Sequence, residues 1–206
     1  MKTGTTTVAM VCRDGIVLAA DQKATMGHLV ASKDTQKVFE ISPKICMTIA
    51  GSAGDGQAMA RLLKAELNLY ELQEKKVTVK AAATLLANIL RGAYKSFIPE
   101  YVQLVLGGCD ARGPQLYSAD AAGGLSPEDE YAFSGSGSVI ALGVLEDGYK
   151  KDMSTGDGVN LLLRSIRAAR ERDVYTGGKS MHIAVITKDG IKWIKDEQIK
   201  GIIAKL

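Results

Sequence analysis

The order of strand-like and helix-like segments constrains the fold of this 206-residue chain most strongly. Hairpin-like strands come first, two amphipathic helices follow, and the second half of the chain repeats strands and then helices. Parallel sheets need single helices that alternate with strands, whereas helices that follow runs of hairpins in pairs favour antiparallel sheets. We therefore expect an α+β fold, a four-layer αββα sandwich in which two stacked antiparallel sheets are flanked by helix pairs.

The expected strands are rich in β-branched and apolar residues, and turn dipeptides separate several of them. Asp14-Gly15 and Asp189-Gly190 are strong hairpin signals, because both residue types tolerate the positive φ angles of two-residue turns. The expected strands span residues 5–12, 16–24, 37–41, 45–50, 102–109, 115–119, 130–133, 181–187 and 191–194.

The helices are predicted from apolar residues at helical spacing. The first carries Met59, Leu62, Leu63, Leu67 and Tyr70, and the second carries Val79, Ala82, Leu86, Leu90, Ala93 and Phe97. Thr78 is the expected N-cap of the second helix, and Ser154 opens a later one with a capping-box-like sequence. Residues 139–145 are apolar on nearly every face, so a helix there is expected to be buried.

Charge and hydropathy exclude several classes of protein. The formal net charge is only +3, which does not indicate a nucleic-acid or membrane-surface protein. The longest apolar run, at about residues 139–145, is far shorter than the roughly 18 residues of a spanning helix, and no secretory signal is visible. We expect no membrane or nucleic-acid partner and a cytoplasmic location.

The cysteines and histidines limit the chemistry that the chain can perform. Cys12, Cys46 and Cys109 are widely spaced within apolar stretches, which indicates buried thiols without disulfides. There is no CxxC motif, and His28 and His182 are the only histidines, so we expect no metal and no cofactor. Any Ser-His or Cys-His mechanism would have to use one of these two histidines.

Two glycine-rich loops precede expected helices, at residues 51–56 and 135–138. Such loops bind phosphate in some proteins, but the spacing here matches no nucleotide fingerprint, and Asp55 adds negative charge. A tight connection between strand and helix is the favoured interpretation. A third interpretation stays open, in which the backbone N–H groups face a developing oxyanion.

A basic stripe of Arg164, Arg167 and Arg170 recurs at every third residue of an expected helix. Nucleic-acid binding is one interpretation, but Glu171 and Asp173 interrupt the stripe and no aromatic residues accompany it. A helix surface that faces solvent or another subunit is favoured.

Gly4-Thr5-Thr6-Thr7 lies almost at the start of the chain, directly before an expected strand. Taken alone, this run indicates only that threonine favours strands. Asp21 and Lys37 then follow at 16 and 32 residues beyond Thr5, and further motifs come in order. The motifs are Gly4-Thr5-Thr6-Thr7-Val8, Leu18-Ala19-Ala20-Asp21, Lys37-Val38-Phe39, Met47-Thr48-Ile49-Ala50-Gly51, Asp120-Ala121-Ala122-Gly123-Gly124, Gly135-Ser136-Gly137-Ser138 and Arg172-Asp173.

Together these motifs resemble the β subunit of the archaeal-type 20S proteasome, one of the N-terminal nucleophile (Ntn) hydrolases. The resemblance covers the chain from Gly4 to about Ile199 and implies the same αββα sandwich. It also implies a short propeptide, residues 1–4, that is removed autocatalytically between Gly4 and Thr5, and a single hydrolase domain over residues 5–206.

The resemblance implies a role for each matching residue. Thr5 corresponds to the nucleophile, Asp21 to the buried acid and Lys37 to the catalytic lysine. The polar groups around the terminal amine correspond to Ser136, Asp173 and Thr176, and the oxyanion donor corresponds to Gly51. The family commonly has serine at the position of Thr176, so the added methyl group changes the packing there. The substrate pocket beside the nucleophile corresponds to Ala24, Thr25, Thr35, Ile49 and Ala53.

These residue types suit such a site chemically. A threonine hydroxyl needs a positioned base, and the α-amino group of Thr5 would have a reference pKa of about 7.7–8.0. A nearby Lys37 cation would lower the pKa of that amine, and Asp21 would hold the lysine in place. The β-methyl group of Thr5 restricts χ1 and helps to orient its hydroxyl.

The resemblance implies a proteolytic subunit, a threonine-type endopeptidase that degrades unfolded polypeptides. Its implied partners are other β subunits in a ring, proteasome α subunits and a separate ATPase unfoldase that acts through the α ring. One alternative is a non-catalytic structural subunit of such a ring, which Thr5, Asp21 and Lys37 together disfavour. The other is the bacterial two-ring threonine protease, whose shorter chains make it a poorer match in length.

Overall fold

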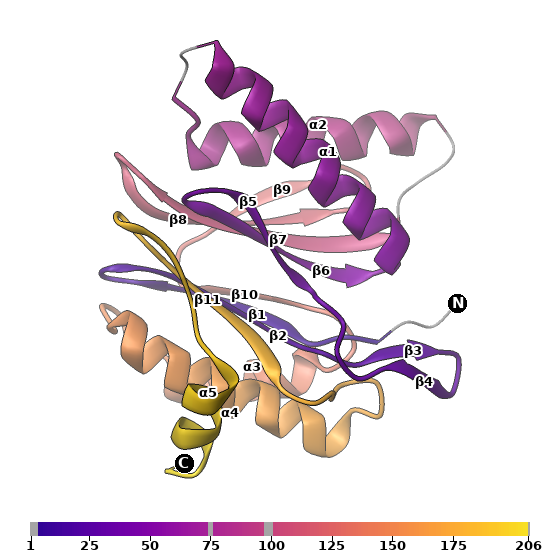
Figure 1. Cartoon of the computed structure of the whole chain (residues 1–206), viewed down its shortest axis with the longest axis vertical. Helices are drawn as coiled ribbons and strands as arrows, with labels where there is room; N and C mark the ends of the chain where they lie inside the picture. The colour runs from indigo at the N-terminus through magenta and orange to yellow at the C-terminus, as the bar shows by residue number, and fades with distance from the viewer. Residues whose placement is uncertain (1–3, 74–75, 97–100, 206) are drawn as a thin grey trace.

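The computed structural model describes residues 4–73, 76–96 and 101–205, and they form four layers (Figure 1). The first sheet has the order β10-β1-β2-β11-β12 and the second has the order β5-β6-β7-β8-β9, and all their pairings are antiparallel. The four-layer sandwich predicted from the sequence is therefore confirmed. The strands of the first sheet are β1 (Thr7–Cys12), β2 (Gly15–Asp21), β10 (Tyr131–Ser134), β11 (Met181–Thr187) and β12 (Gly190–Trp193). Those of the second are β5 (Val38–Ser42), β6 (Ile45–Gly51), β7 (Val102–Asp110), β8 (Gly113–Asp120) and β9 (Leu125–Glu128).

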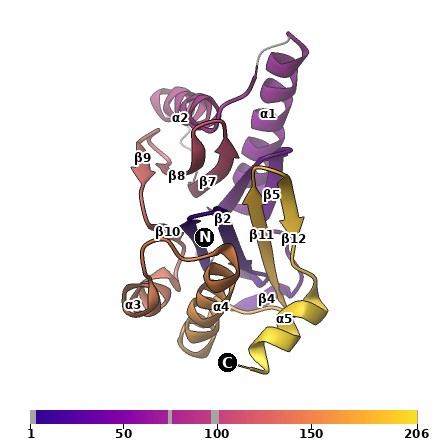
Figure 2. The same ribbon diagram turned by 90° about the vertical axis from the view of Figure 1, so that its left-hand side faces the viewer.

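Helices cover the outer face of each sheet, as Figures 1 and 2 show. Helices α1 (Ala53–Leu72) and α2 (Val79–Lys95) lie on the second sheet, and α3 (Ser138–Gly148) and α4 (Thr155–Arg172) lie on the first. The short C-terminal helix α5 (Asp196–Ile203) contacts α4. No helix among the described residues is long and apolar enough to cross a membrane.

Strand β2 shows how one sequence serves both faces of its sheet. Ile16 and Leu18 pack between the two sheets, whereas Val17 and Ala19 pack toward α3 and α4. Because side chains alternate across a strand, a strand covered on both faces is apolar on both, as β2 is from Ile16 to Ala20. Three buried clusters result, one between each pair of adjacent layers.

The predicted helix caps are present. Thr78 Oγ1 accepts a hydrogen bond from the Ala81 N–H at 3.1 Å, and Ser154 Oγ accepts one from the Asp157 N–H at 3.1 Å. Each hydroxyl satisfies a backbone donor that the first turn of a helix leaves free. Phe97, which was expected on the second helix, lies outside the described residues.

Helix α3 differs from the expectation that residues 139–145 are buried. Only Ser138, Ala141 and Leu145 of this helix are buried, and Val139 is 76% exposed. The helix lies at the edge of its layer, where α4, β10 and β1 contact one side of it (Figure 2). The expectation of a fully buried segment is therefore wrong, because an apolar composition does not supply a partner for the outer face.

Four elements were not expected from the sequence. The strand predicted for residues 16–24 ends at Asp21, and the chain then forms a separate hairpin of β3 (Ala24–Met26) and β4 (Leu29–Ser32). Strand β9 and helix α5 were also missed. The hairpin carries three exposed apolar side chains, Met26, Leu29 and Val30, and it projects at the right-hand side of the molecule in Figure 1.

Several strand ends meet at one edge of the sandwich and position the candidate site. In the first sheet, Thr7 pairs with both Ala20 and Ser134, and Asp21 pairs with Met181. In the second sheet, β6 ends at Gly51, opposite Val102. Antiparallel pairing therefore brings the start of β1 together with the ends of β2 and β10.

Candidate active site

Thr5 lies immediately before β1 and is 5% exposed. Its side-chain Oγ1 donates a hydrogen bond to the carbonyl oxygen of Gly4 at 2.7 Å, and its backbone N–H donates to Ser136 Oγ at 3.3 Å. The hydroxyl therefore contacts the peptide group that joins residues 4 and 5. The backbone nitrogen of Thr5 already faces a side chain 131 positions further along the chain.

Asp21 is completely buried and accepts four hydrogen bonds. Its Oδ1 accepts from Lys37 Nζ at 2.7 Å and from the Thr6 N–H at 3.0 Å, and its Oδ2 accepts from the N–H groups of Gly177 and Lys23 at 2.8 and 3.1 Å. A carboxylate can remain charged in the interior only when it is paired in this way. Asp21 thus holds Lys37 and the start of β1 together.

Lys37 is 5% exposed, and burial lowers the pKa of its ammonium from the ordinary value of 10.5. The Asp21 carboxylate acts in the opposite direction and favours the charged form. The only other ion pair among the described residues, Lys179 with Asp34, is exposed and longer, at 3.7 Å. The Lys37–Asp21 pair is therefore distinguished by both its burial and its 2.7 Å length.

Ser136, Asp173 and Thr176 form one hydroxyl–carboxylate network. Asp173 Oδ2 accepts from Ser136 Oγ at 2.7 Å and from Thr176 Oγ1 at 2.5 Å. Thr176 Oγ1 in turn lies 2.6 Å from Thr6 Oγ1. Because the Ser136 hydroxyl donates its hydrogen bond to Asp173, its oxygen is free to accept a hydrogen bond from the Thr5 N–H. Thr176 thus donates a hydrogen bond to Asp173 through its hydroxyl, and the residue is 2% exposed.

Three glycines around the start of β1 leave no room for a side chain. An added Cβ at Gly135, where φ is +91°, would lie 2.1 Å from the Thr5 carbonyl oxygen. At Gly137 it would lie 2.1 Å from Thr6 Oγ1, and at Gly4 it would lie 1.7 Å from Cβ of Tyr175. Only glycine fits at these positions without a shift of the surrounding chain.

A cavity of about 320 Å³ opens beside Thr5, which is one of its lining residues. Its walls come from the β3–β4 hairpin, from β6 and from the start of α1, and they also include Lys37 and Gly51. The pocket residues named from the sequence, namely Ala24, Thr25, Thr35, Ile49 and Ala53, all line it. Gly51 has φ +109°, and a Cβ there would meet the Tyr101 carbonyl oxygen at 2.2 Å.

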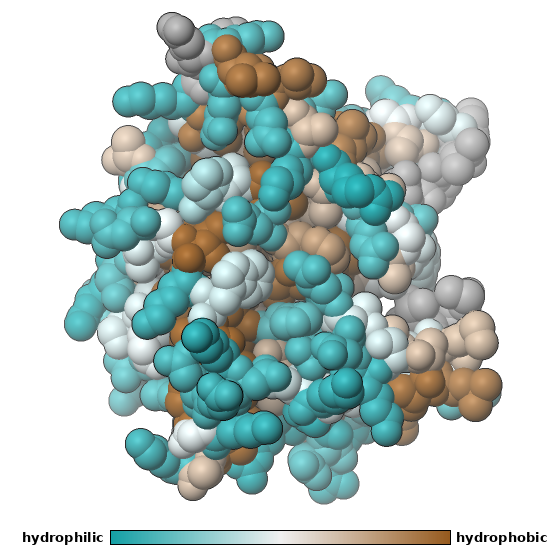
Figure 3. All heavy atoms as spheres, viewed as in Figure 1, coloured by the Kyte–Doolittle hydropathy of each residue, from teal (hydrophilic) through white to brown (hydrophobic). Residues whose placement is uncertain are grey.

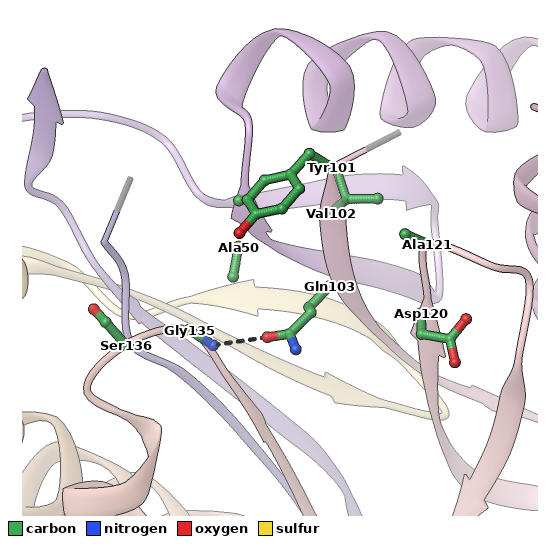
Figure 4. A pocket seen from close by; sticks show the side chains of 9 residues that line it. Ala50, Tyr101, Val102, Gln103, Asp120, Ala121, Gly135 and Ser136 are labelled. Atoms are coloured by element: carbon green, nitrogen blue, oxygen red, sulfur yellow. Dashed lines mark hydrogen bonds between the residues drawn. The ribbon is translucent and has the colours of Figure 1, made fainter. Parts of the chain in front are cut away.

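A second cavity, of about 440 Å³, shares Gly51 with the first, and Figure 4 shows eight of its other lining residues. It is lined by Ala50, Gly51, Tyr101, Val102, Gln103, Asp120, Ala121, Gly135 and Ser136. Gln103 Oε1 accepts a hydrogen bond from the Gly135 N–H at 3.3 Å, so the second sheet supports the loop that carries Ser136. Sequence reasoning did not identify this cavity.

The remaining nucleophile candidates are poorly suited to catalysis. Burial raises the pKa of Cys12 and of Cys46 to about 12, so neither thiol ionises near neutral pH. Burial lowers the pKa of His182 from 6.5, and its Nε2 lies 3.1 Å from Gln22 Nε2. The described residues contain no group of three or more His, Cys, Asp or Glu side chains placed to hold a metal ion.

Other expectations from the sequence also receive a structural answer. Arg164 and Arg167 are exposed, whereas Arg170 donates a hydrogen bond to the Gly178 carbonyl oxygen at 2.9 Å. The loop at residues 51–56 caps α1, because Ser52 Oγ accepts from the Asp55 N–H at 3.5 Å. Lys23 was missed, although its Nζ donates to the Val174 carbonyl oxygen at 2.8 Å and its side chain lines the cavity beside Thr5.

Comparison with known proteins identifies the family. The family model described as "Proteasome subunit" matches residues 1–186. The proteasome subunit beta of Methanobrevibacter smithii is 46% identical over 204 residues, which covers 98% of this chain and 97% of the relative. Those of Methanocaldococcus fervens and Archaeoglobus profundus are each 45% identical, over 98% of this chain and 90% and 94% of their own lengths. With its sandwich fold and full-length similarity to β subunits, the chain belongs to the proteasome subunit family.

Proposed function

We propose that this chain is a threonine-type endopeptidase subunit of a 20S proteasome core particle, with Thr5 as its N-terminal nucleophile. The observation that carries the proposal is the position of the Thr5 hydroxyl, 2.7 Å from the Gly4 carbonyl oxygen, beside the buried Lys37–Asp21 pair and the Ser136–Asp173 network. Residues 1–4 are then a propeptide, and residues 5–206 form the mature domain.

The first reaction is intramolecular. Thr5 Oγ1 bonds to the carbonyl carbon of Gly4, its proton passes to the Thr5 nitrogen, and the Gly4–Thr5 amide bond breaks to leave an ester. Water then cleaves this ester and releases residues 1–4 with a new carboxylate. The glycine at position 4 allows the close packing against Tyr175 that this geometry requires.

Peptide cleavage uses the amine that processing frees. The Thr5 amine takes the proton from Oγ1, and Oγ1 bonds to the substrate carbonyl carbon. The carbon–nitrogen bond breaks, the amine returns the proton to the leaving nitrogen, and water hydrolyses the ester. The Gly51 N–H is the proposed donor to the oxyanion. Lys37 places positive charge near the amine and Oγ1, while Ser136, Asp173 and Thr176 position the amine.

The cavity beside Thr5 is proposed to receive the residue before the cut bond. Ala24, Ile49 and Ala53 in its wall are uncharged, and its two lysines are already bound, Lys37 to Asp21 and Lys23 to the Val174 carbonyl. We therefore expect Leu or Tyr to be preferred over Arg or Glu at this position. Such a broad preference gives little selectivity. Access of polypeptides to Thr5 is then controlled by assembly with other β subunits and with α subunits in the cytoplasm. An ATPase unfoldase supplies unfolded chains to this assembly.

The mass of the assembled protein tests processing directly. Wild type should begin at Thr5, whereas Thr5→Ala should retain residue 4 and be inactive. Lys37→Ala should abolish cleavage of fluorogenic peptides, because the amine and hydroxyl lose their neighbouring charge. Lys179→Ala, which removes the exposed ion pair, is the matched control and should keep wild-type activity. Active wild-type particles that retain residues 2–4, or normal turnover by Lys37→Ala, would contradict the proposal.

Assembly has a separate test in size-exclusion chromatography with light scattering. The chain alone should be largely unprocessed and inactive, and addition of the cognate α subunit should give a large active particle. Full activity in a monomer peak near the chain mass of 21.9 kDa would refute the requirement for assembly. An assembled particle that stays unprocessed and inactive would instead identify a structural ring subunit.

A further inference from the structure

We infer that the second cavity, between Tyr101, Gln103 and Asp120, binds the part of the substrate that follows the cut bond and favours a basic residue there. This inference rests on the proposed function, because it takes Thr5 as the nucleophile. It names Asp120 as a residue that determines specificity.

Three adjacent strands form the floor of this cavity. Ala50 on β6 is paired with Gln103 on β7, and Gln103 is paired with Asp120 on β8, so the three residues form one row across the second sheet. Gly135 and Ser136, which follow β10 of the first sheet, close the opposite side. Figure 4 shows Gln103 between Ser136 and Asp120, with the Tyr101 ring above Ala50.

The cavity is connected to the site through two shared residues. Gly51 lines both cavities, and Ser136 contacts the Thr5 nitrogen at 3.3 Å. The Thr5 amine must return its proton to the leaving nitrogen of the substrate. The leaving half of the peptide therefore lies on the amine side of Thr5, which is the side of Ser136 and of the second cavity.

Asp120 gives this cavity its charge. It is the only charged residue among the nine that line the cavity, and it is exposed. Its Oδ1 accepts from the N–H groups of Ala122 and Gly124 at 2.8 and 2.9 Å, which fixes the carboxylate at the rim. Within the described part of the chain, Oδ2 has no hydrogen bond and Asp120 has no ion pair.

The surroundings do not cancel this negative charge. Asp55 adds a second carboxylate next to Tyr101, one of the lining residues: its Oδ2 accepts a hydrogen bond from the Tyr101 N–H at 3.1 Å. The Arg91 guanidinium donates a hydrogen bond to the Ala122 carbonyl oxygen at 3.5 Å and forms no ion pair with Asp120. A lysine or arginine side chain could extend its aliphatic part along the Tyr101 ring and place its cation at the Asp120 carboxylate.

The test uses internally quenched peptides with a fixed Leu before the cut bond. Lys, Ala or Glu occupies the first or the second position after it, and kcat/KM is measured with assembled, processed particles. Wild type should cleave the Lys peptide roughly fivefold faster than the Glu peptide at one of these positions, because attraction and repulsion by an exposed carboxylate add. The ratio should fall toward one in 0.5 M salt, since screening weakens exposed charges.

Asp120→Asn is the decisive variant. An Asn oxygen still accepts from the Ala122 and Gly124 N–H groups, so the loop should keep its shape while the charge is lost. The Lys-to-Glu ratio should fall to about one. Asp189→Asn is the matched control, because it removes the same charge from the β11–β12 turn, at the opposite end of the first sheet, and should keep the wild-type ratio.

The possible outcomes separate this inference from the proposed function. Cleavage of every peptide with the same Lys-to-Glu ratio in wild type and Asp120→Asn would overturn the inference and leave the proposed function intact. No cleavage of any peptide, or of an aminocoumarin substrate that ends at the cut bond, would overturn both. A ratio that is lost only in Asp120→Asn and in high salt supports the assignment.

Discussion

Two strand-to-helix loops that both begin with Gly-Ser serve different purposes in this molecule. Gly51-Ser52-Ala53-Gly54 joins β6 to α1, and Gly135-Ser136-Gly137-Ser138 joins β10 to α3. In the first loop, Ser52 is the N-cap of α1 and its hydroxyl accepts from the Asp55 N–H. In the second, the hydroxyl of Ser136 turns toward Thr5 and Asp173, and the N-cap of α3 is Gly137, which makes no side-chain cap hydrogen bond.

The difference shows that a serine between a strand and a helix can serve either the helix or the site. A glycine N-cap costs a helix only about a few tenths of a kcal/mol relative to serine, and α3 bears this small cost. The loops also differ in what their second glycine contacts. A Cβ at Gly54 would meet nothing within 4 Å, whereas one at Gly137 would collide with Thr6 Oγ1.

The largest effect is expected from Gly135→Ala. The new methyl group would lie 2.1 Å from the Thr5 carbonyl oxygen at a φ of +91°, and we expect a loss of roughly 3 kcal/mol in the free energy of unfolding. Chemical denaturation measures it. Gly54→Ala in the other loop is the control, and it should be neutral or stabilising. Equal stability of the two variants would remove the distinction between the loops.

Exchange of the two serines for alanine should separate activity from stability. Ser136→Ala removes the acceptor for the Thr5 nitrogen, and a loss of roughly 100-fold in kcat is expected. Ser52→Ala should instead lower the melting temperature by a few degrees through the lost cap. Fluorogenic peptide assays and thermal melts on both variants decide this. A greater loss of kcat in Ser52→Ala than in Ser136→Ala would reverse the comparison.

Gly137→Ser should reverse an ordinary rule. Serine is a better N-cap than glycine by a few tenths of a kcal/mol, so this change would stabilise most helices. Here its Cβ would lie 2.1 Å from Thr6 Oγ1, and a loss of about 2 kcal/mol is expected. Urea unfolding of assembled and isolated chains provides the measurement, and any stabilisation would show that the network can move aside.

The smallest effect concerns pH. Residues 51–54 and 135–138 carry no titratable side chain, so the change in stability that each loop variant causes should be the same at pH 5 as at pH 7.

The pH dependence of stability is instead expected from His182. Burial lowers the pKa of His182, so the unfolded chain takes up a proton before the folded chain does, and stability should fall as pH drops below about 6.5. His182→Gln should reduce this fall, by about 1–2 °C in melting temperature. An unchanged fall would place its origin elsewhere.

The sequence predicted the layers well, because they depend on local periodicity. Thr78 and Ser154 cap their helices, and both Asp-Gly turns join adjacent strands, as expected. The β3–β4 hairpin was missed because its exposed strands have no apolar alternation that marks a buried face. The exposure of Val139 was missed because periodicity says nothing about how many partners surround a helix.

The site was predictable only in part. The structure brings Thr5, Asp21, Lys37, Ser136 and Asp173 together, yet their selection came from a resemblance and their catalytic roles stay predictions. Gln103 and Lys23 carry no local signal. Their importance depends on contacts such as Gln103 with Gly135, between residues 32 positions apart on different sheets.

The hydrogen bonds of Asp21 have a consequence for biosynthesis. Its carboxylate accepts hydrogen bonds from the N–H of Thr6 and from the N–H of Gly177, which lies 156 positions after Asp21, so both segments must be present before these bonds are complete. Asp173, which orients Ser136, is also near the C-terminal end of the chain. Thr5 leaves the ribosome early, but its surroundings cannot form until almost the whole polypeptide has emerged. Under the proposed function, a nascent or truncated chain therefore carries an inert Thr5, and translation itself delays the proposed chemistry until the fold is complete.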